Sequence, residues 1–471
     1  TKPTVGIENY PKVEAPYKYS ARQVIDDYFT YDMPIGYFLP NDGYGAGYGQ
    51  NGYGKTGGVD NEGKSSQERL AAVAANVQNL ADFTKYANEK GVATGLWTQS
   101  YLTPDSNPKT EWQLLRDFKN EVKVGGVSTL KTDVAWVGHG YSMQLDGVKT
   151  AYDIATTEGK VRPNIISLDG WAGSQRYCGI WTGDQYGGEW EYIRFHIPTY
   201  IGTSLSGNPN IGSDMDGIFG GNQLIATRDY QWKSFTPLML NMDGWGTYAK
   251  MPYTFGDPYT GINRMYLKTK AQLLPYIYTG AASAANIDTG NGDTGLPLIR
   301  AMFLEYPDDS YASSKEMQYQ YMLGSNLLVA PIYKSTAADD KGNDVRNNIY
   351  LPDSKEVWID YFTGQQYQGG QVLNNFAAPL WKLPVFVKNG AIIPMWEENN
   401  TPEQIKKENR IVEFWPDGKT SYTMFEDDGK FVENDLKEDG DYGKITKTSY
   451  GAHVSTKYTS EVKDGTATLT A

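Results

Sequence analysis

The feature that most constrains the fold is an alternation of short apolar runs with longer helical patterns between residues 21 and 245. Apolar residues recur at spacings of three and four over residues 68–90, and less regularly over 190–203. Because strands that alternate with helices form parallel sheets, this pattern predicts an α/β architecture. The runs that predict strands are 35–39, 93–98, 129–136, 164–168, 177–181, 210–213 and 238–242.

Several of these predicted strands end in acidic residues. Asp133, Asp184 and Asp214 each stand at or just after the end of an apolar run. In a (β/α)8 TIM barrel, the C-terminal ends of the strands carry the active site. We therefore predict this barrel. Seven strands are found, so we expect an upstream polypeptide to supply the first strand and an N-terminal β-sandwich.

From residue 298 onward the pattern changes to short β runs separated by Gly, Pro and Asp, which predicts antiparallel β-sandwich domains. The predicted organisation is a catalytic barrel over 1–297, a proximal C-terminal β-sandwich over 298–400 and the start of a distal β domain over 401–471. The runs that predict strands in the first sandwich are 298–303, 327–332, 348–351, 356–360, 385–387 and 391–394.

Composition excludes several classes of function. The chain has 56 acidic and 43 basic residues, a net charge of −13, so most of its surface repels a nucleic-acid backbone. Its single cysteine, Cys178, and three histidines, His139, His196 and His453, cannot assemble a disulfide framework or a Cys/His metal cluster. No apolar run reaches the length of a membrane span. Oxygen chemistry must therefore carry any reaction.

Aromatic residues make up 13% of the chain, and 36 of them are tyrosines. Such rings suit the binding of sugars, although a Tyr-rich β protein without a ligand has a similar composition. A tryptophan at a strand end can stack on a pyranose ring or belong to the core. The candidates for stacking are Trp97, Trp136, Trp171, Trp181 and Trp245.

Two strand-end carboxylates suggest a reaction. Glycosidic bonds are cleaved by a pair of carboxyl groups, one of which attacks the anomeric carbon or activates water while the other protonates the leaving oxygen. Asp133 lies within the run at 129–136, after Leu130-Lys131-Thr132, and Asp184 lies three residues after Trp181, which ends the run at 177–181. A lone aspartate at such a place also caps a helix or binds a loop, so the pattern by itself leaves both interpretations open.

The segments around these aspartates resemble glycoside hydrolase family 31, a family of retaining α-glycosidases and α-transglucosidases. Residues 181–184, followed by Trp190, resemble the acid/base segment of the family, and 130–136 its nucleophile strand. The other matching segments are 210–217, similar to the next strand-end acidic motif, 41–43, similar to an early strand, 300–307, 327–331, 358–364 and 383–395 in the proximal C-terminal domain, and 422–429 in the distal one.

The resemblance implies that Asp133 is the nucleophile and Asp184 the general acid/base. A retaining mechanism implies a covalent glycosyl-enzyme on Asp133 and a separation of roughly 5 to 5.5 Å between the two carboxyl groups. Asp184 has to be protonated in the free enzyme. We expect the aromatic neighbours Tyr177, Trp181 and Trp190 to raise its pKa by lowering the local polarity.

The resemblance also implies residues that bind substrate. Asp42 matches the aspartate that holds the sugar in subsite −1. Arg176 matches an arginine near the active site; it either binds sugar hydroxyls or forms a salt bridge between strands. Asp214 belongs to the strand-end acidic motif. Asp169 and Asp243 stand in matching Asp-Gly-Trp triplets, where we favour contacts with substrate hydroxyls over structural turns.

One departure from the family bears on the substrate. Members that trim terminal glucose carry Arg-Asn-His at the end of the last strand, where this chain has Leu240-Asn241-Met242. This stretch and residues 168–173 resemble the branch that transfers or hydrolyses isomaltosyl units. The prediction is therefore hydrolysis or transfer on α-1,3/α-1,6-linked glucans, such as cycloalternan or alternan oligosaccharides, without deciding whether water or a sugar is the acceptor.

Two alternatives remain open. A neighbouring branch of the family releases α-linked N-acetylgalactosamine and has a loop similar to Asn-Asp-Gly-Tyr-Gly at 41–45. The alternative of another class is a non-catalytic carbohydrate-binding protein.

No cofactor is expected. A structural Ca²⁺ stays open, because residues 288–293 have an acid-and-glycine spacing that faintly resembles a calcium loop but lacks the later bidentate glutamate. His139 either touches substrate or lies in a loop, and His196 is expected to be a helix histidine with its hydrogen bonds satisfied.

Overall fold

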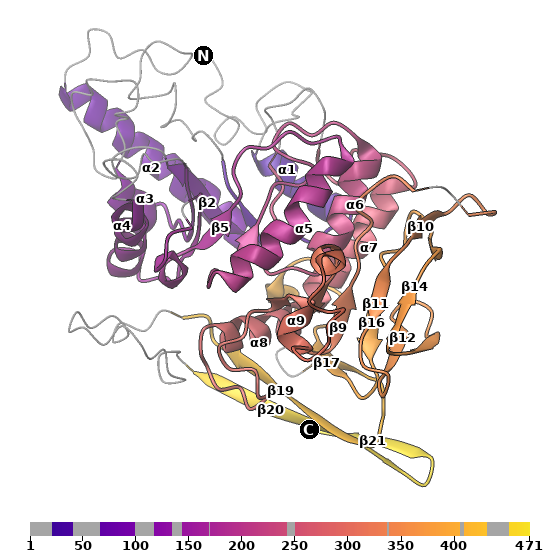
Figure 1. Ribbon diagram of the computed structural model, residues 1–471. Coiled ribbons are helices and arrows are strands. Elements are labelled where there is room, and N and C mark those ends of the chain that lie inside the picture. The colour runs from indigo at the N-terminus through magenta and orange to yellow at the C-terminus, as the bar shows by residue number, and fades with distance from the viewer. Residues whose placement is uncertain are drawn as a thin grey trace. The chain divides into compact units, whose positions relative to one another are not determined.

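The structure is a computed structural model that describes residues 21–40, 66–98, 117–133, 144–168, 170–242, 250–336, 339–405, 409–430 and 452–471. Two compact units are distinguished. The first contains the described residues up to Trp181, together with 400–404 and 429–430, and the second contains the other described residues. Figure 1 shows the elements of both.

The first unit is built on parallel strands whose order in the sheet follows their order in the chain, β1-β2-β3-β4-β5. Neighbouring parallel strands joined through helices are the connectivity expected of the predicted barrel. The strands are β1 Tyr37–Phe38, β2 Ala93–Thr98, β3 Thr129–Thr132, β4 Asn164–Ser167 and β5 Gly179–Trp181. The helices are α1 Ala21–Thr30, α2 Ser66–Glu89, α3 Phe118–Lys123, α4 Gln144–Thr157, and the 3-10 helices η3 Ser174–Arg176 and η5 Pro402–Gln404.

These strands form because their apolar residues are buried in register. Leu96 pairs with Leu130, which pairs with Ile165, and the three side chains are at most 2% exposed. Parallel strands covered on both faces read as continuous apolar runs, the pattern seen in the sequence. The strand predicted at 93–98 is confirmed in full, and α2 confirms the helix predicted at 68–90.

The predicted strand 177–181 begins two residues later than expected. Residues 174–176 form η3, and the backbone N–H groups of Tyr177 and Cys178 donate to Ser174 O, at 2.9 and 3.0 Å. Because these donors are used in the turn, the pairing with β4 begins only at Gly179, opposite Ile166, and continues with Ile180 opposite Ser167.

The second unit begins with helices around one short strand. Its elements are α5 Trp190–Leu205, β6 Ile211–Gly212, α6 Gln223–Lys233, α7 Tyr259–Gln272 and α8 Leu274–Ala284. The helix predicted at 190–203 is confirmed as α5. The strand predicted at 238–242 reduces to a single parallel bridge between Leu240 and Asp214. Asn241 instead donates its side-chain amide to Lys250 O at 3.3 Å.

The rest of the second unit is antiparallel β structure, as predicted. A six-stranded sheet has the order β13-β12-β16-β9-β8-β7, and a three-stranded sheet has the order β19-β20-β21. The elements are β7 Ile299–Arg300, α9 Met302–Glu305, η4 Lys315–Tyr319, β8 Tyr321–Leu323, β9 Leu327–Val329, β10 Asp344–Arg346, β11 Ile349–Leu351, β12 Val357–Asp360, β13 Gln366–Gln368, β14 Gln371–Leu373, β15 Phe376–Ala378, β16 Val385–Lys388, β17 Ile392–Met395, β18 Ile411–Phe414, β19 Lys419–Asp427, β20 His453–Lys463 and β21 Thr466–Thr470.

The strand predicted at 298–303 was wrong in its second half, which forms the single turn α9. The buried guanidinium of Arg300 explains the turn. It donates to Pro297 O at 2.8 Å and to Asp293 Oδ2 at 2.7 Å, and the turn brings Glu305 back to it as a third acceptor. A buried charge needs hydrogen-bond partners. The helical turn provides Glu305 as a partner for Arg300, whereas a strand would place Glu305 out of its reach.

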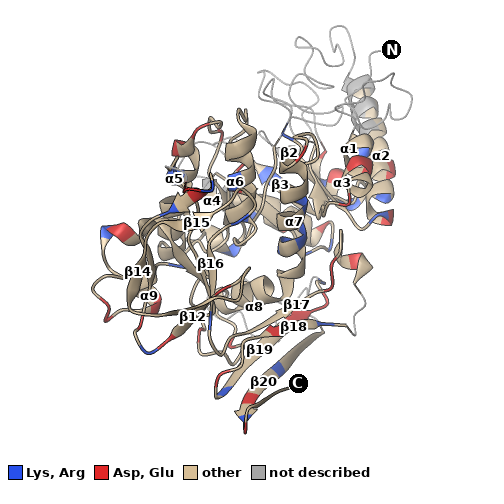
Figure 2. Ribbon diagram, turned by 90° about the vertical axis from the view of Figure 1, so that its right-hand side faces the viewer, with Lys and Arg blue, Asp and Glu red and all other residues tan. Residues whose placement is uncertain are grey.

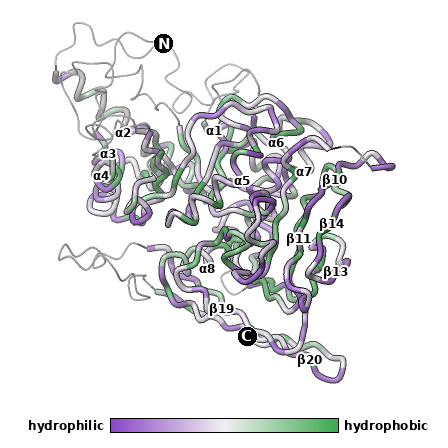
Figure 3. The backbone as a smooth tube through the Cα atoms, viewed as in Figure 1, coloured by the Kyte–Doolittle hydropathy of each residue, from purple (hydrophilic) through white to green (hydrophobic). Residues whose placement is uncertain are grey.

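The core of the β region centres on Trp358, Phe386, Leu328 and Met322, all buried. Figure 3 shows hydrophobic residues along α8, and β19 packs beside this helix. In Figure 2, basic and acidic residues intermix on α1 and on the antiparallel pair β19 and β20. In the part of the chain that the structure describes, no helix is long and apolar enough to cross a membrane.

Candidate active site

Asp133 stands at the end of β3, where its carboxylate is fixed by the neighbouring strand. Trp97 on β2 donates its indole N–H to Asp133 Oδ2 at 2.8 Å. The parallel register makes this bond, because it pairs Trp97 with Lys131, two residues before Asp133. The side chain of Asp133 is 19% exposed, so it is held without being sealed from solvent.

A buried cation lies beneath this carboxylate. The Nζ of Lys131 is 4.0 Å from Asp133 Oδ2 and 3.8 Å from the centroid of the Trp181 ring, and the Lys131 side chain is wholly buried. The cation attracts the Asp133 carboxylate, and the face of the Trp181 ring stabilises the cation. Sequence reasoning missed this lysine, although a lysine inside an apolar strand, two residues before a strand-end aspartate, is the signal that marks it.

The tryptophans predicted to bind sugar fall into two groups. Trp97 and Trp181 are 4% and 1% exposed, so their rings belong to the core and support Asp133 and Lys131. Burial of both rings favours the core alternative over stacking on pyranose rings, because a buried face offers no surface to a sugar. Trp171, in contrast, is 50% exposed.

Replacing Trp97 with phenylalanine is expected to lower kcat by roughly 10- to 100-fold, because a hydrogen bond to a charged group contributes about 1.5–3 kcal/mol. Steady-state kinetics of the purified variant check this. Trp358→Phe is the matched control, since it also removes a buried indole donor, one bonded to Pro352 O at 3.0 Å in the β region. Equal losses in the two variants would mean that the Trp97 bond serves only the fold.

Asp184 lies in the loop after β5, and its side chain is exposed. The expected separation between the two carboxyl groups and the raised pKa of Asp184 stay predictions. The residues next to Asp184 are held firmly. Thr182 donates its hydroxyl to His196 Nε2 at 3.0 Å, and Gln185 donates its side-chain amide to Thr182 O at 3.1 Å.

His196 is a helix histidine with both ring nitrogens bonded, as predicted. Its Nδ1 lies 2.7 Å from Tyr192 O, and because a carbonyl only accepts, Nδ1 carries the proton and Nε2 accepts from Thr182. Burial, with Lys233 nearby, lowers the pKa of His196 to about 3. The ring therefore stays neutral and acts as a fixed support for the segment that leads to Asp184.

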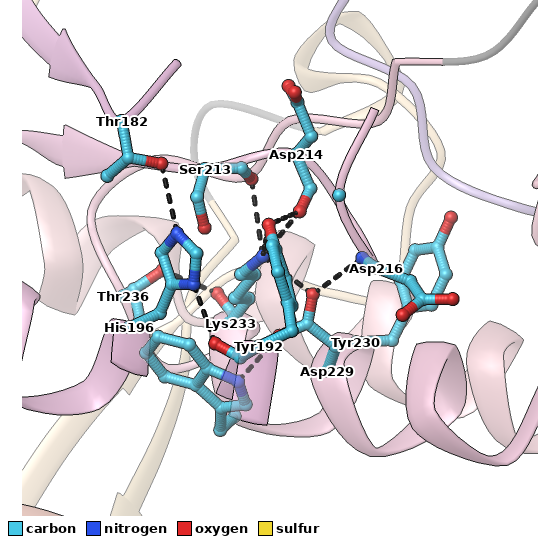
Figure 4. A network of polar contacts seen from close by, with 12 residues as sticks. Thr182, Tyr192, His196, Ser213, Asp214, Asp216, Asp229, Tyr230, Lys233 and Thr236 are labelled. Carbon is cyan, nitrogen blue, oxygen red and sulfur yellow. Dashed lines mark hydrogen bonds and ion pairs between the residues drawn. The ribbon is translucent and has the colours of Figure 1, made fainter. Parts of the chain in front are cut away.

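Asp214 follows β6 and is 1% exposed. Its backbone carbonyl accepts from Lys233 Nζ at 2.8 Å and from the Tyr192 hydroxyl. Lys233 is itself buried and pairs with Asp229 at 2.6 Å, one helical turn back along α6. Figure 4 shows this network, which ties the end of β6 to α5 and α6. Sequence reasoning missed Lys233 and Asp229, whose i,i+4 spacing is typical of a solvent-exposed helix face.

Of the other predicted residues, Arg176 is exposed at the end of η3. The ring of Tyr186, which sequence reasoning did not select, is 83% exposed and stacks on Phe219 with centroids 5.0 Å apart. The remaining candidates lie outside the described residues: Asp42, Trp136, His139, Asp169, Asp243 and Trp245.

The carboxylate oxygens of the acidic loop at 288–293 accept hydrogen bonds from protein groups. Asp293 accepts from Ser283 at 2.9 Å and from Arg300 at 2.7 Å, and Asp288 accepts from the backbone of Gly290 at 2.9 Å. Among the described residues, no group of three or more His, Cys, Asp or Glu side chains is arranged to hold a metal ion.

The chain has a parallel α/β unit, with a carboxylate fixed at the end of one strand, and it continues into antiparallel sheets. These features place it in the class of barrel proteins whose strand ends carry acidic residues. Comparison with known proteins identifies the family. The chain belongs to glycosyl hydrolase family 31, because the TIM-barrel domain of that family matches residues 71–280 and its C-terminal domain matches residues 295–393. The predicted family and the predicted fold class are thereby confirmed.

Curated relatives agree with this assignment. Alpha-glucosidase 2 of Bacillus thermoamyloliquefaciens is 30% identical over 328 residues, which is 64% of this chain and 39% of that protein. A probable glucan 1,3-alpha-glucosidase of Arabidopsis thaliana is 32% identical over 311 residues, 66% of this chain and 31% of that protein. The chain thus spans less than half the length of these relatives.

Solved structures share the fold. A dextranase of this family from Flavobacterium johnsoniae aligns with a TM-score of 0.69 and 22% identity, over 95% of this chain and 58% of that one. A cycloalternan-forming enzyme from Listeria monocytogenes aligns with a TM-score of 0.67 and 20% identity, over 86% of this chain and 44% of that one.

Proposed function

We propose that the chain carries the catalytic machinery of a retaining α-glycosidase or α-transglycosidase that works by double displacement. The observation that carries this proposal is the support of Asp133 by the Trp97 indole and the buried Lys131. A fixed, partly solvated carboxylate is what attack on an anomeric carbon requires.

The proposed reaction has two steps. Asp133 attacks the anomeric carbon while Asp184 protonates the departing glycosidic oxygen, so the old C–O bond breaks and a glycosyl-aspartate ester forms. Asp184, now ionised, then removes a proton from water or from a sugar hydroxyl, and the oxygen of that acceptor displaces Asp133 from the anomeric carbon. Hydrolysis and transfer share both residues and differ only in the acceptor.

For the substrate we propose α-1,3/α-1,6-linked glucans, such as cycloalternan or alternan oligosaccharides. Leu240-Asn241-Met242 stands where arginine and histidine would grip a terminal glucose. Here the Asn241 amide is bonded to Lys250 O, and Met242 is only 9% exposed. Binding energy then has to come from more distant sugar units, for which the half-exposed ring of Trp171 offers a stacking surface.

The second candidate substrate is an α-N-acetylgalactosaminide, which the residues at 41–45 favour through their resemblance to the branch that releases this sugar. The glucan and the galactosaminide differ at the 2- and 4-positions of the ring, so direct competition in one assay separates them. Binding of oligosaccharides without turnover would identify the non-catalytic alternative.

A substrate panel tests the proposal. It contains maltose, isomaltose, alternan oligosaccharides, cycloalternan and an α-N-acetylgalactosaminide. We expect glucans of four or more units to exceed maltose by at least about tenfold in kcat/KM, a difference of about 1.4 kcal/mol. Rapid release of N-acetylgalactosamine without action on the glucans would assign the second candidate, and efficient trimming of maltose would contradict the argument from residues 240–242.

A further inference from the structure

The loop that carries Asp184 is bound to the loop after β6 by a buried carboxylate. Asp216 is wholly buried, and its two oxygens accept from two backbone N–H groups. Oδ1 accepts from Gly188 at 2.6 Å, and Oδ2 accepts from Asn222 at 3.2 Å. The first of these donors lies four residues after Asp184, so the carboxylate closes the acid/base loop at its far end.

The two loops also approach each other backbone to backbone. Ile218 N–H donates to Gln185 O at 3.0 Å. A Cβ on Gly187 would lie 1.6 Å from Asp216 O, and a Cβ on Gly217 would lie 2.3 Å from Gln185 O. Only glycine permits contacts this close, so the loops have one way of fitting together. Outside them, the stacked rings of Tyr186 and Phe219 brace the same contact.

Residues of helix α6 hold the backbone of Asp216 in place. Its backbone N–H donates to Asp229 Oδ2 at 2.9 Å, and the same oxygen accepts from Lys233 Nζ at 2.6 Å (Figure 4). Lys250 Nζ donates to Gly217 O and, at 2.5 Å, to Met242 O. With φ at 51°, Asp216 also holds a left-handed backbone conformation that non-glycine residues rarely adopt. The carboxylate therefore stands on a rigid support.

Stability does not explain a carboxylate at this place. Burial raises the pKa of Asp216 from 3.8 to about 6; the Gly188 and Asn222 hydrogen bonds oppose the shift, the charge of Asp229 adds to it, and Lys250 opposes it. A raised pKa means that the contribution of Asp216 to the free energy of unfolding is full below pH 4 and is lost as pH rises through about 6. At neutral pH the ionised carboxylate therefore lowers the free energy of unfolding. Groups with such perturbed pKa values are often found at functional sites.

We propose that Asp216 is a positioning residue that holds the acid/base loop, and through it Asp184, in the geometry for protonating the leaving oxygen. This role rests on the function proposed above. The geometry requires an acceptor at both carboxylate oxygens, because each faces a backbone N–H. Asparagine at 216 has nearly the same shape but presents an NH₂ group to one of these donors, so one of the two bonds is lost: either the bond to Gly188 that joins the loops, or the bond to Asn222 that holds the carboxyl group in place for it.

The test compares two substrates of Asp216→Asn. One is an oligosaccharide that the wild type cleaves, whose sugar leaving group needs a proton from Asp184. The other is the glycosyl fluoride of the sugar that the wild type releases, whose leaving group needs little protonation. We expect kcat/KM for the oligosaccharide to fall at least about tenfold and kcat/KM for the fluoride to stay within about twofold. A merely structural role would lower both alike.

Asp360→Asn is the matched control. Asp360 is also a buried carboxylate in the second unit, where it accepts from Phe362 N at 3.1 Å and pairs with Lys382 at 2.5 Å. We expect this variant to change the two substrates equally. If Asp216→Asn fails to fold, as judged by circular dichroism, Phe219→Ala replaces it. This change removes the ring that braces Tyr186 at a half-exposed position, and it should give the same selective loss.

The outcomes separate this role from the proposed function. A wild type that cleaves none of the oligosaccharides of the panel and no glycosyl fluoride would refute the proposed function, and the positioning role with it. An active wild type whose Asp216→Asn variant, or Phe219→Ala in its place, loses equal activity on both substrates would refute the positioning role alone.

Discussion

Asp133→Asn is expected to lower kcat/KM by at least about a hundredfold while leaving the fold intact, because covalent catalysis supplies a large share of the barrier reduction. Asparagine is nearly isosteric with aspartate, and its amide oxygen can still accept from the Trp97 indole, which donates to Asp133 Oδ2 at 2.8 Å in the native protein. The loss should therefore reflect nucleophilicity and not local collapse. Initial rates on the best substrate of the panel, with thermal melting of the same preparations, provide the measurement.

Asp153→Asn is the control for this variant. Asp153 is a carboxylate of the same unit, 40% exposed on α4 and paired with Lys149 at 2.5 Å. A surface pair of this kind contributes little to stability, so activity should be unchanged. Activity of Asp133→Asn above about a hundredth of the wild-type value would remove Asp133 from the role of nucleophile.

Asp184→Ala is expected to affect substrates according to their leaving groups. Oligosaccharides, whose sugar leaving groups need a proton, should lose at least about a hundredfold in kcat/KM, whereas glycosyl fluorides should lose far less. Asp184 is exposed, so its truncation leaves no cavity and the fold should persist. The ratio of the two kcat/KM values, measured for wild type and variant, reports the proton transfer directly.

Asp340→Ala removes an exposed carboxylate from the β region and should leave that ratio unchanged. Equal losses on both substrate types in Asp184→Ala would assign Asp184 a structural role. The same pair of substrates also compares the effects of Asp184 and Asp216. Asp184→Ala should show the larger selective loss of activity on the oligosaccharide, and Asp216→Asn a smaller loss of the same kind.

The sequence predicted the parts of the fold that depend on local pattern. Apolar runs such as 93–98 predict strands because both faces are buried, and the spacing in α2 predicts its helix. Predictions failed where long-range contacts compete with the local pattern. Residues 302–305 form a helical turn because buried Arg300 needs Glu305 as an acceptor, a contact that no local pattern reveals.

In the candidate site, too, features with a local pattern were predicted and long-range contacts were not. Asp133 and Asp184 are recognised from the strands that they end and from the resemblance of their segments. The contacts that support them were not predicted, because strand register and loop packing bring the supporting residues together. Trp97 reaches Asp133 only because β2 and β3 pair in one register, and Asp216 reaches Gly188 only because the two glycine-containing loops fit together. Neither relation is visible as a spacing in the chain.

In the proposed reaction, Asp133 forms a covalent bond with the sugar. The most direct measurement is mass spectrometry of the protein after incubation with a 5-fluoroglycosyl fluoride of its substrate sugar, which slows the second step and lets the ester accumulate. We expect a gain of one fluoroglycosyl unit, located by peptide fragmentation on Asp133 and missing from Asp133→Asn. An active protein that gains the label on another residue, or cleaves its substrate with inversion at the anomeric carbon, would contradict the proposed reaction.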